Sequence, residues 1–196
     1  MENIRGRVAR GAIWMVAFRM VDRLLGLAST LVLARVLVPH DFGVVAMAMS
    51  VVALLELATA FGFDVALINR QSQDRDEWDT AWTFGVLFGL AVALVLVAAA
   101  SPIAAFFRTT ELELVIRILA LGSVIQGFQN IGVVSFRKEM QFDREFYFMA
   151  SRKIVSVMVT IPLAIALDSY WALVIGQIAG RLTGTLASYR FHPYRP

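Results

Sequence analysis

The sequence predicts an all-α fold, that of a polytopic membrane protein with six transmembrane helices. Hydrophobic residues make up 59% of its 196 positions, whereas about 45–50% is usual in soluble domains. The mean hydropathy of +0.70 agrees with this composition. Six apolar runs alternate with polar turns, and each is close to or above the roughly 20 residues that cross a bilayer. Residues 1–10 are expected to form a basic cytoplasmic N-terminus rather than a signal peptide, because the first apolar run is too long for one.

The first predicted helix, residues 11–37, carries Arg19, Asp22 and Arg23 within an otherwise apolar run. At about 100° per residue, these three side chains fall on one side of the helix. A charge at the bilayer centre costs about 2.5–3.5 kcal/mol even on a lenient scale, so this face is unsuited to lipid. We therefore expect it to face the interior of a helix bundle or a water-filled cavity.

Five further helices follow, separated by short turns or by charged loops at residues 69–79 and 137–145. The fourth helix of the chain, residues 112–136, is the most polar of the six, because it contains Arg117, two glutamines and an asparagine. These five helices are predicted at residues 42–68, 80–107, 112–136, 146–167 and 170–189, and residues 190–196 are expected to begin a cytoplasmic connector.

Lys and Arg flank the predicted helices unequally, and this bias indicates the orientation. One side holds ten of them and the other only Arg35 and Arg108. Because positive residues collect in cytoplasmic loops, the bias places both termini in the cytoplasm. The ten are Arg5, Arg7, Arg10, Arg70, Arg75, Arg137, Lys138, Arg144, Arg190 and Arg195.

Charged residues inside the predicted helices suggest a cationic cavity that binds a phosphate-bearing ligand. Arginine suits this role, because it stays charged and can bind phosphate through two hydrogen bonds. The alternative is a set of internal ion pairs that hold helices together. Arg23 and Glu56 are the preferred pair, since both lie about 18 Å from the cytoplasmic end at 1.5 Å per residue. The substrate-binding candidates are Arg19, Asp22, Arg23, Glu56 and Arg181.

Two further interpretations of the charged residues remain open. Arg152 and Lys153 lie close enough to the interface to extend their side chains into water, which favours a structural role for them. Glu56 and Asp64 are alternatively carriers of a coupled proton or sodium ion, because desolvation raises the pKa of a buried carboxylate. One sequence does not separate ion coupling from salt-bridge formation.

Glycines spaced four apart predict close approach of neighbouring helices. They occur at residues 85 and 89, and again at 176, 180 and 184. No catalytic motif, metal-ligand spacing or cysteine is found in the sequence. We therefore expect a protein that is not an enzyme and that carries neither cofactor nor metal. Its basic residues lie between apolar runs rather than on one patch, which argues against nucleic-acid binding.

Five segments together point to a known family. They are RGAIW at residues 10–14, LARVLVPHDFG at 33–43, FGFDVALINR at 61–70, FRKEMQFDR at 136–144 and YWALVIGQIAG at 170–180. In order and at matching spacing over nearly the whole chain, they resemble the polysaccharide-biosynthesis flippases of the multidrug/oligosaccharidyl-lipid/polysaccharide exporter superfamily.

This resemblance implies a two-lobed transporter of the bacterial inner (plasma) membrane, of which the chain supplies the first, six-helix lobe. The implied substrate is a polyprenyl-pyrophosphate-linked oligosaccharide, exported for surface polysaccharide synthesis. The implied partners are the lipid bilayer and a second transmembrane lobe, from a missing C-terminal half or another chain. Two alternatives are a non-transporting assembly subunit of a polysaccharide export complex and a cation-coupled drug antiporter of the same superfamily.

Overall fold

The computed structural model describes residues 2–60, 75–138 and 141–196, and within these ranges it contains helices and turns but no strand. Within the described ranges, six helices have 17 or more residues. In chain order, the elements are α1 (Glu2–Leu33), α2 (Pro39–Ala60), α4 (Arg75–Phe107), α5 (Glu111–Gly127), the 3₁₀ helix η1 (Ile131–Val134), α6 (Ser135–Lys138), α7 (Phe142–Leu167) and α8 (Trp171–Phe191).

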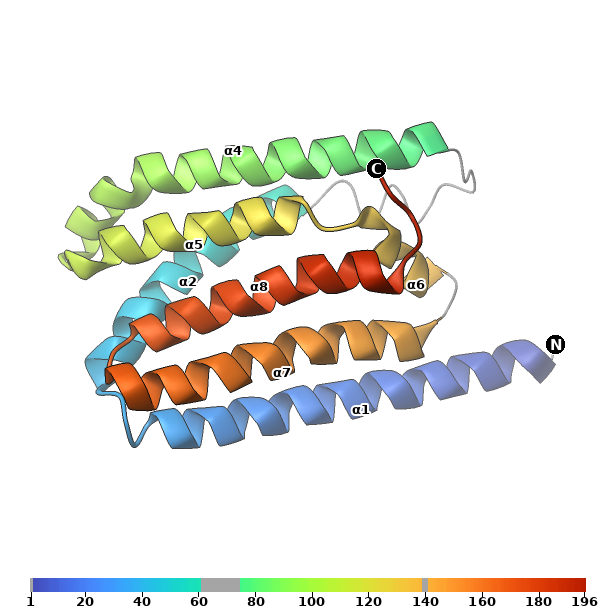
Figure 1. Ribbon diagram of the computed structural model, residues 1–196, viewed down its shortest axis with the longest axis horizontal. Helices are drawn as coiled ribbons and strands as arrows, with labels where there is room; N and C mark the ends of the chain where they lie inside the picture. The colour runs from blue at the N-terminus through green and yellow to red at the C-terminus, as the bar shows by residue number, and fades with distance from the viewer. Residues whose placement is uncertain (1, 61–74, 139–140) are drawn as a thin grey trace.

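Five of the long helices lie side by side in one layer, in the order α1, α7, α8, α5, α4, and α2 crosses behind α5 and α8 (Figure 1). α1 begins and the C-terminal tail ends at the same end of this bundle. The main apolar core lies between α2, α4, α5 and the start of α8. Its fully buried side chains include Val52 of α2, Leu96 of α4, Leu119 of α5 and Val174 of α8.

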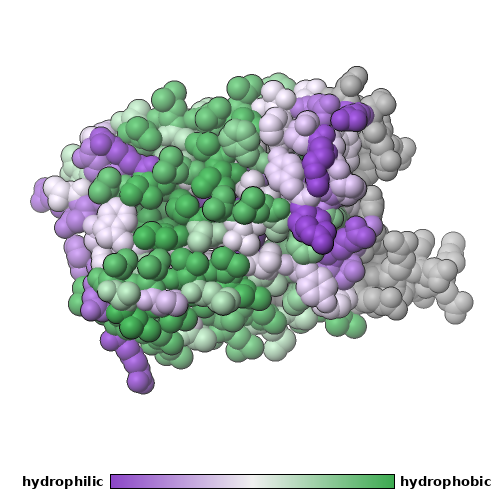
Figure 2. Space-filling model, in the orientation of Figure 1, coloured by the Kyte–Doolittle hydropathy of each residue, from purple (hydrophilic) through white to green (hydrophobic). Residues whose placement is uncertain are grey.

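The surface of the bundle is that of a membrane protein, which confirms the predicted all-α membrane class. In Figure 2, a hydrophobic belt fills the middle of the visible face, with hydrophilic residues at both ends. Large apolar side chains stay exposed, among them that of Leu94 at 71%, which suits contact with lipid rather than water. Among the described residues, three helices are long and apolar enough to cross a membrane, at Pro39–Leu57, Trp78–Phe107 and Phe142–Leu167.

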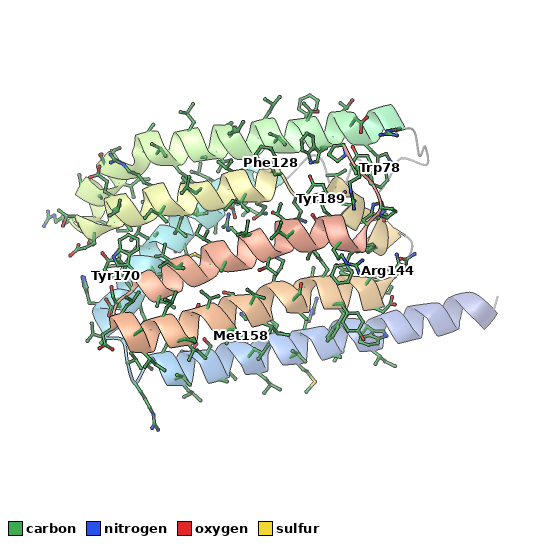
Figure 3. All side chains as sticks on the ribbon, viewed as in Figure 1. Trp78, Phe128, Arg144, Met158, Tyr170 and Tyr189 are labelled. Atoms are coloured by element: carbon green, nitrogen blue, oxygen red, sulfur yellow. The ribbon has the colours of Figure 1, made fainter. Side chains whose placement is uncertain are left out.

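Aromatic residues also gather near the ends of the bundle, as interfacial anchors do. Trp78 and Tyr189 lie near the end that holds the tail, and Tyr170 lies near the other end (Figure 3). The number of spans, six, stays a prediction, because α5 has only 17 residues and part of the chain lies outside the described ranges.

The structure divides the predicted fourth segment, residues 112–136, into α5, a turn and the short helices η1 and α6. The cause is local hydrogen bonding by Asn130, whose extended backbone ends the helical path. The Asn130 side chain accepts a hydrogen bond from the Gly132 amide at 2.8 Å. The backbone N–H of Asn130 donates to the Ser188 hydroxyl of α8 at 2.9 Å. A short polar side chain competes with the helix for backbone partners, so the turn forms where the sequence is most polar.

The other helix bounds shift by less. α1 and α4 begin before the predicted residues 11 and 80, α7 begins at Phe142 rather than at 146, and α8 extends past residue 189 to Phe191. A prediction from hydropathy places helix ends where the apolar run ends. It therefore misses polar and charged residues that are still helical but lie outside the apolar belt.

Close packing at glycines confirms the prediction from the four-residue spacing. A Cβ atom added to Gly89 of α4 would lie 2.7 Å from the Ser123 carbonyl oxygen and 2.9 Å from the Gly127 Cα of α5. A Cβ added to Gly180 of α8 would lie 3.3 Å from the Arg152 carbonyl oxygen of α7. Since these neighbours are backbone atoms, they have little freedom to move aside, and any larger residue would separate the helices.

We predict that Gly89→Ala lowers the thermal stability of the detergent-solubilised protein, because the new methyl group would overlap the α5 backbone. Overpacking of this kind costs about 1–3 kcal/mol. The matched control is Gly43→Ala in α2, where an added Cβ meets no atom within 4 Å and alanine is the better helix former. Equal melting temperatures for the two variants would contradict this account of the α4–α5 contact.

Candidate functional site

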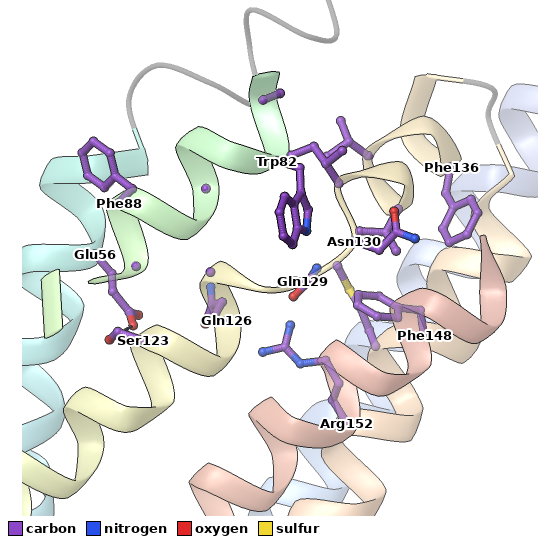
Figure 4. A pocket seen from close by; sticks show the side chains of 18 of the residues that line it. Glu56, Trp82, Phe88, Ser123, Gln126, Gln129, Asn130, Phe136, Phe148 and Arg152 are labelled. Carbon is purple, nitrogen blue, oxygen red and sulfur yellow. Dashed lines mark hydrogen bonds between the residues drawn. The ribbon is translucent and has the colours of Figure 1, made fainter. Parts of the chain in front are cut away.

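A polar cavity of about 360 Å³ opens between the helices, with walls from α2, α4, α5, η1, α6 and α7 (Figure 4). Aromatic rings form part of its wall, among them Trp82, Phe88 and Phe148. Its polar residues come from four separate segments. They are Glu56 of α2, Ser123 and Gln126 of α5, Gln129 and Asn130 of the following turn, and Glu145 and Arg152 of α7.

Arg152 supplies a positive charge to this cavity. Figure 4 shows its guanidinium pointing from α7 into the space near Gln126 and Gln129. Gly184 of α8 makes room for the side chain, because a Cβ at that position would lie 2.7 Å from Arg152 Cδ. The guanidinium also lies 6.0 Å from the centre of the Phe148 ring, within the range of a cation–π contact. Packing on both sides therefore positions this cation.

A second arginine, Arg181 of α8, forms an ion pair with Glu56 of α2. Arg181 Nη1 donates to Glu56 Oε1 at 2.5 Å, and Nη2 donates to Oε2 at 3.3 Å. The Ser123 hydroxyl donates to the same carboxylate at 3.2 Å. The Arg181 side chain is only 10% exposed and that of Glu56 is 30% exposed. The ion pair and the hydrogen bond from Ser123 together join α2, α5 and α8 at the edge of the cavity.

The predicted partner of Glu56 was Arg23, and the structure replaces it with Arg181. The two predicted depths agree, but depth does not say which helices are neighbours. α1 packs chiefly on α7, whereas α2 packs on α5, so Arg23 lies exposed on a helix remote from Glu56.

The three charged residues of α1 separate in the structure. Asp22 forms an ion pair with Lys153 of α7, at 3.3 Å between Oδ1 and Nζ. Arg19 lines a second hollow, of about 200 Å³, between α1 and α7. Arg23 lines neither hollow. Asp64, a candidate for ion coupling, lies outside the described residues.

Of the predicted binding residues, then, Glu56 lines the main cavity and Arg181 lies behind it. Arg152, which the sequence favoured as a structural residue at the interface, contributes directly to the wall. The one signal that could have found it is the glycine stripe of α8, since a small residue opposite a long cation leaves room for the side chain. The described residues contain no cluster of three or more His, Asp or Glu side chains suited to a metal.

The C-terminal tail closes one end of the bundle beside this cavity. The Tyr194 hydroxyl donates to Asp79 of α4 at 2.5 Å, and the Tyr194 carbonyl accepts from Asn130 Nδ2 at 2.7 Å. His192 stacks on the Trp78 ring, with centroids 5.9 Å apart. Burial, followed by the hydrogen bond to Asp79, raises the pKa of Tyr194 far above its usual range. Through its hydrogen bond to Asp79, the protonated phenol holds the tail on α4.

A family model and the relatives with similar sequences agree on the family of this chain. The model of the family described as "Polysaccharide biosynthesis protein" matches residues 32–196. The chain is 24% identical over 189 residues to the "Succinoglycan biosynthesis transport protein ExoT" of Rhizobium meliloti (strain 1021), covering 95% of this chain and 38% of that protein. It is also 24% identical over 185 residues to the "Lipopolysaccharide biosynthesis protein WzxC" of Escherichia coli (strain K12), covering 93% of this chain and 36% of that protein.

A third relative, an "Uncharacterized membrane protein in cps region" of Klebsiella pneumoniae, is 21% identical over 141 residues, 72% of this chain and 29% of that protein. The chain thus spans well under half the length of each of these curated relatives. No solved structure matches it significantly.

We predict strong energetic coupling between Glu56 and Arg181. In a double-mutant cycle with Glu56→Gln and Arg181→Gln, the free energy of unfolding in detergent should show a coupling of about 1–3 kcal/mol, because each single change leaves a poorly solvated partner. The matched control is the cycle of Asp22→Asn and Lys153→Gln. Those side chains are 42% and 35% exposed, so their coupling should stay below about 1 kcal/mol. Equal coupling in the two cycles would argue against a special role for the Glu56 pair.

We also predict that the cavity is hydrated in the membrane. The chain has no cysteine, so single cysteines can be labelled with a water-soluble maleimide. Gln129→Cys in the cavity should react. Leu94→Cys should not, although Leu94 is 71% exposed, because lipid covers it. An unreactive Gln129→Cys, in membranes where Pro196→Cys reacts, would mean a dry cavity.

Proposed function

Because the chain belongs to the polysaccharide biosynthesis protein family, we propose that it forms the N-terminal lobe of a transporter that flips a lipid-linked oligosaccharide across the membrane. The observation that carries this proposal is the polar cavity inside an otherwise apolar helix bundle, with Arg152 directed into it. Ionisable residues inside membrane proteins generally mark a substrate or ion pathway, because they are costly elsewhere. Transport requires no change in the substrate's bonds, so the proposed protein is not an enzyme.

Two arginines suit the anionic part of such a substrate. Arg152 faces the cavity, and Arg181 lies behind Glu56 at its edge. A guanidinium can bind a phosphate group through two parallel hydrogen bonds. An incoming diphosphate would attract both cations and would compete with Glu56 for Arg181. Glu56 is for this reason also our candidate for ion coupling, since loss of its partner favours uptake of a proton or a metal cation.

The rest of the wall suits the sugar part. Gln126 and Gln129 carry amide groups that can donate to or accept from hydroxyl groups. Trp82 and Phe88 offer flat apolar surfaces, and cofactor and ligand sites commonly combine such surfaces with a few polar groups. The cavity volume of about 360 Å³ is at the small end of the usual range of about 300–1,000 Å³. We infer that one lobe holds only part of an oligosaccharide.

A second lobe would complete the site. We propose that it comes from the rest of a longer chain or from another protein, and that the two lobes rock against each other to open the cavity to either side of the membrane. The proposed location is the bacterial inner membrane, with both ends of this chain in the cytoplasm. This orientation is supported by ten positive flanking residues on one side against two on the other. It puts the cavity near the cytoplasmic end.

We predict that Arg152→Gln, in the complete protein, reduces export about tenfold or more. A hydrogen bond to a charged group contributes about 1.5–3 kcal/mol, and 1.4 kcal/mol corresponds to a factor of ten. Surface polysaccharide and internal lipid-linked intermediate would be quantified in cells that lack the native gene. Arg152→Lys should restore part of the activity, since it keeps the charge but not the two-point geometry.

The control is Arg190→Gln, which removes an exposed arginine from the last turn of α8. It should export normally at the same protein level. Normal export by Arg152→Gln at normal protein level would overturn the assignment of this cavity to the substrate.

A further inference from the structure

We propose that the hollow between α1 and α7 binds the hydrocarbon chain of the lipid whose headgroup occupies the polar cavity, so that the two form one elongated site. This inference deepens the proposed function and rests on it. It adds a subsite that the sequence did not predict, because it depends on which helix packs beside α1.

The lateral hollow is small and largely apolar. Its volume is about 200 Å³, and its wall includes Met15 of α1 and Phe142, Phe146 and Met149 of α7. The Trp14 ring packs on Phe146 with centroids 5.1 Å apart. A wall of methionine and aromatic side chains adapts to flexible apolar ligands, and the volume is below the usual range for a compact drug-sized ligand. A segment of an alkyl or isoprenoid chain fits both properties.

One turn of α7 connects this hollow to the polar cavity. Glu145 and Met149 line both spaces, and residues four apart lie one above the other on a helix face. The two hollows therefore lie on either side of these two side chains. A ligand with a polar head and an apolar chain could reach from one hollow into the other along this turn.

The charges at the boundary suit a phosphate rather than a neutral lipid. Arg19 lines the lateral hollow and Arg152 lines the polar cavity, so a cation stands on each side of the shared turn. Glu145, which lines both spaces, is only 9% exposed.

The position in the membrane also favours an apolar chain. α1 and α7 run in the same direction from the end of the bundle that holds the tail (Figure 1). They are at one edge of the layer, so the hollow between them faces lipid directly. Met15 is itself 43% exposed, which leaves a lateral opening through which a chain can slide without crossing the core.

The test uses the full chain in vesicles and two photoreactive polyprenyl phosphates, one with a diazirine in the chain and one with a diazirine on the phosphate-linked head. We expect the chain probe to label residues around Met15 and Phe146, and the head probe to label the wall around Arg152. Excess unlabelled polyprenyl phosphate should suppress both signals, and excess phosphatidylglycerol should not.

Met15→Trp fills the lateral hollow and should reduce labelling by the chain probe at least fivefold while labelling by the head probe persists. The matched control is Met20→Trp, on the same helix but outside either hollow and 60% exposed, and it should label as the wild type does. The wild-type pattern alone tests the inference if Met15→Trp fails to fold.

The outcomes separate this inference from the proposed function. Labelling of the cavity by the head probe, with no chain labelling between α1 and α7, overturns the subsite and leaves the proposed function standing. Suppression of the chain signal by phosphatidylglycerol overturns it as well, because the hollow would then be a general lipid groove. No labelling by either probe overturns both.

Discussion

The contact between α7 and α8 is the constraint on which the rest of the site depends. Gly176, Gly180 and Gly184 let these helices approach until backbone and side-chain atoms of α7 lie within van der Waals distance of α8. In lipid, where helices gain little by hiding apolar surface from one another, such close packing is a principal source of association. It also directs the Arg152 side chain across Gly184 and into the cavity, so one feature both joins the helices and positions a charge.

A second constraint is the need to satisfy charge inside an apolar bundle. Breaking a buried ion pair leaves an uncompensated charge and is strongly destabilising, although the intact pair contributes little net stability. Stability alone therefore does not explain the pair of Glu56 and Arg181, because apolar residues would stabilise the bundle equally well. Its position beside Ser123 and at the cavity that Arg152 also lines suits the proposed exchange, in which Arg181 leaves Glu56 for an incoming diphosphate. The tail, tied to α4 through Tyr194, closes the same end of the bundle.

Sequence reasoning reached the all-α membrane class and singled out the charged residues that lie within apolar runs. It located Glu56 and Arg181 as candidates because charged residues are conspicuous in apolar runs. It paired Glu56 with Arg23, because equal depth along two helices is visible in a sequence but the angle around the bundle is not. It also undervalued Arg152, since a residue about 9 Å from the interface can reach water or a cavity equally well, and only the opposing Gly184 decides between them.

The sequence by itself determined that this chain folds as apolar helices, because backbone groups in lipid must be satisfied within each helix and the composition leaves no soluble alternative. It also determined where helices can approach closely, since glycines spaced four apart share one face. The tertiary structure decided which helices are neighbours, and therefore that Arg181 meets Glu56, that Lys153 meets Asp22, and that α7 separates two hollows. The physical reason is that these contacts depend on packing between segments far apart in the chain. The local spacing of residues does not determine which of these segments are neighbours.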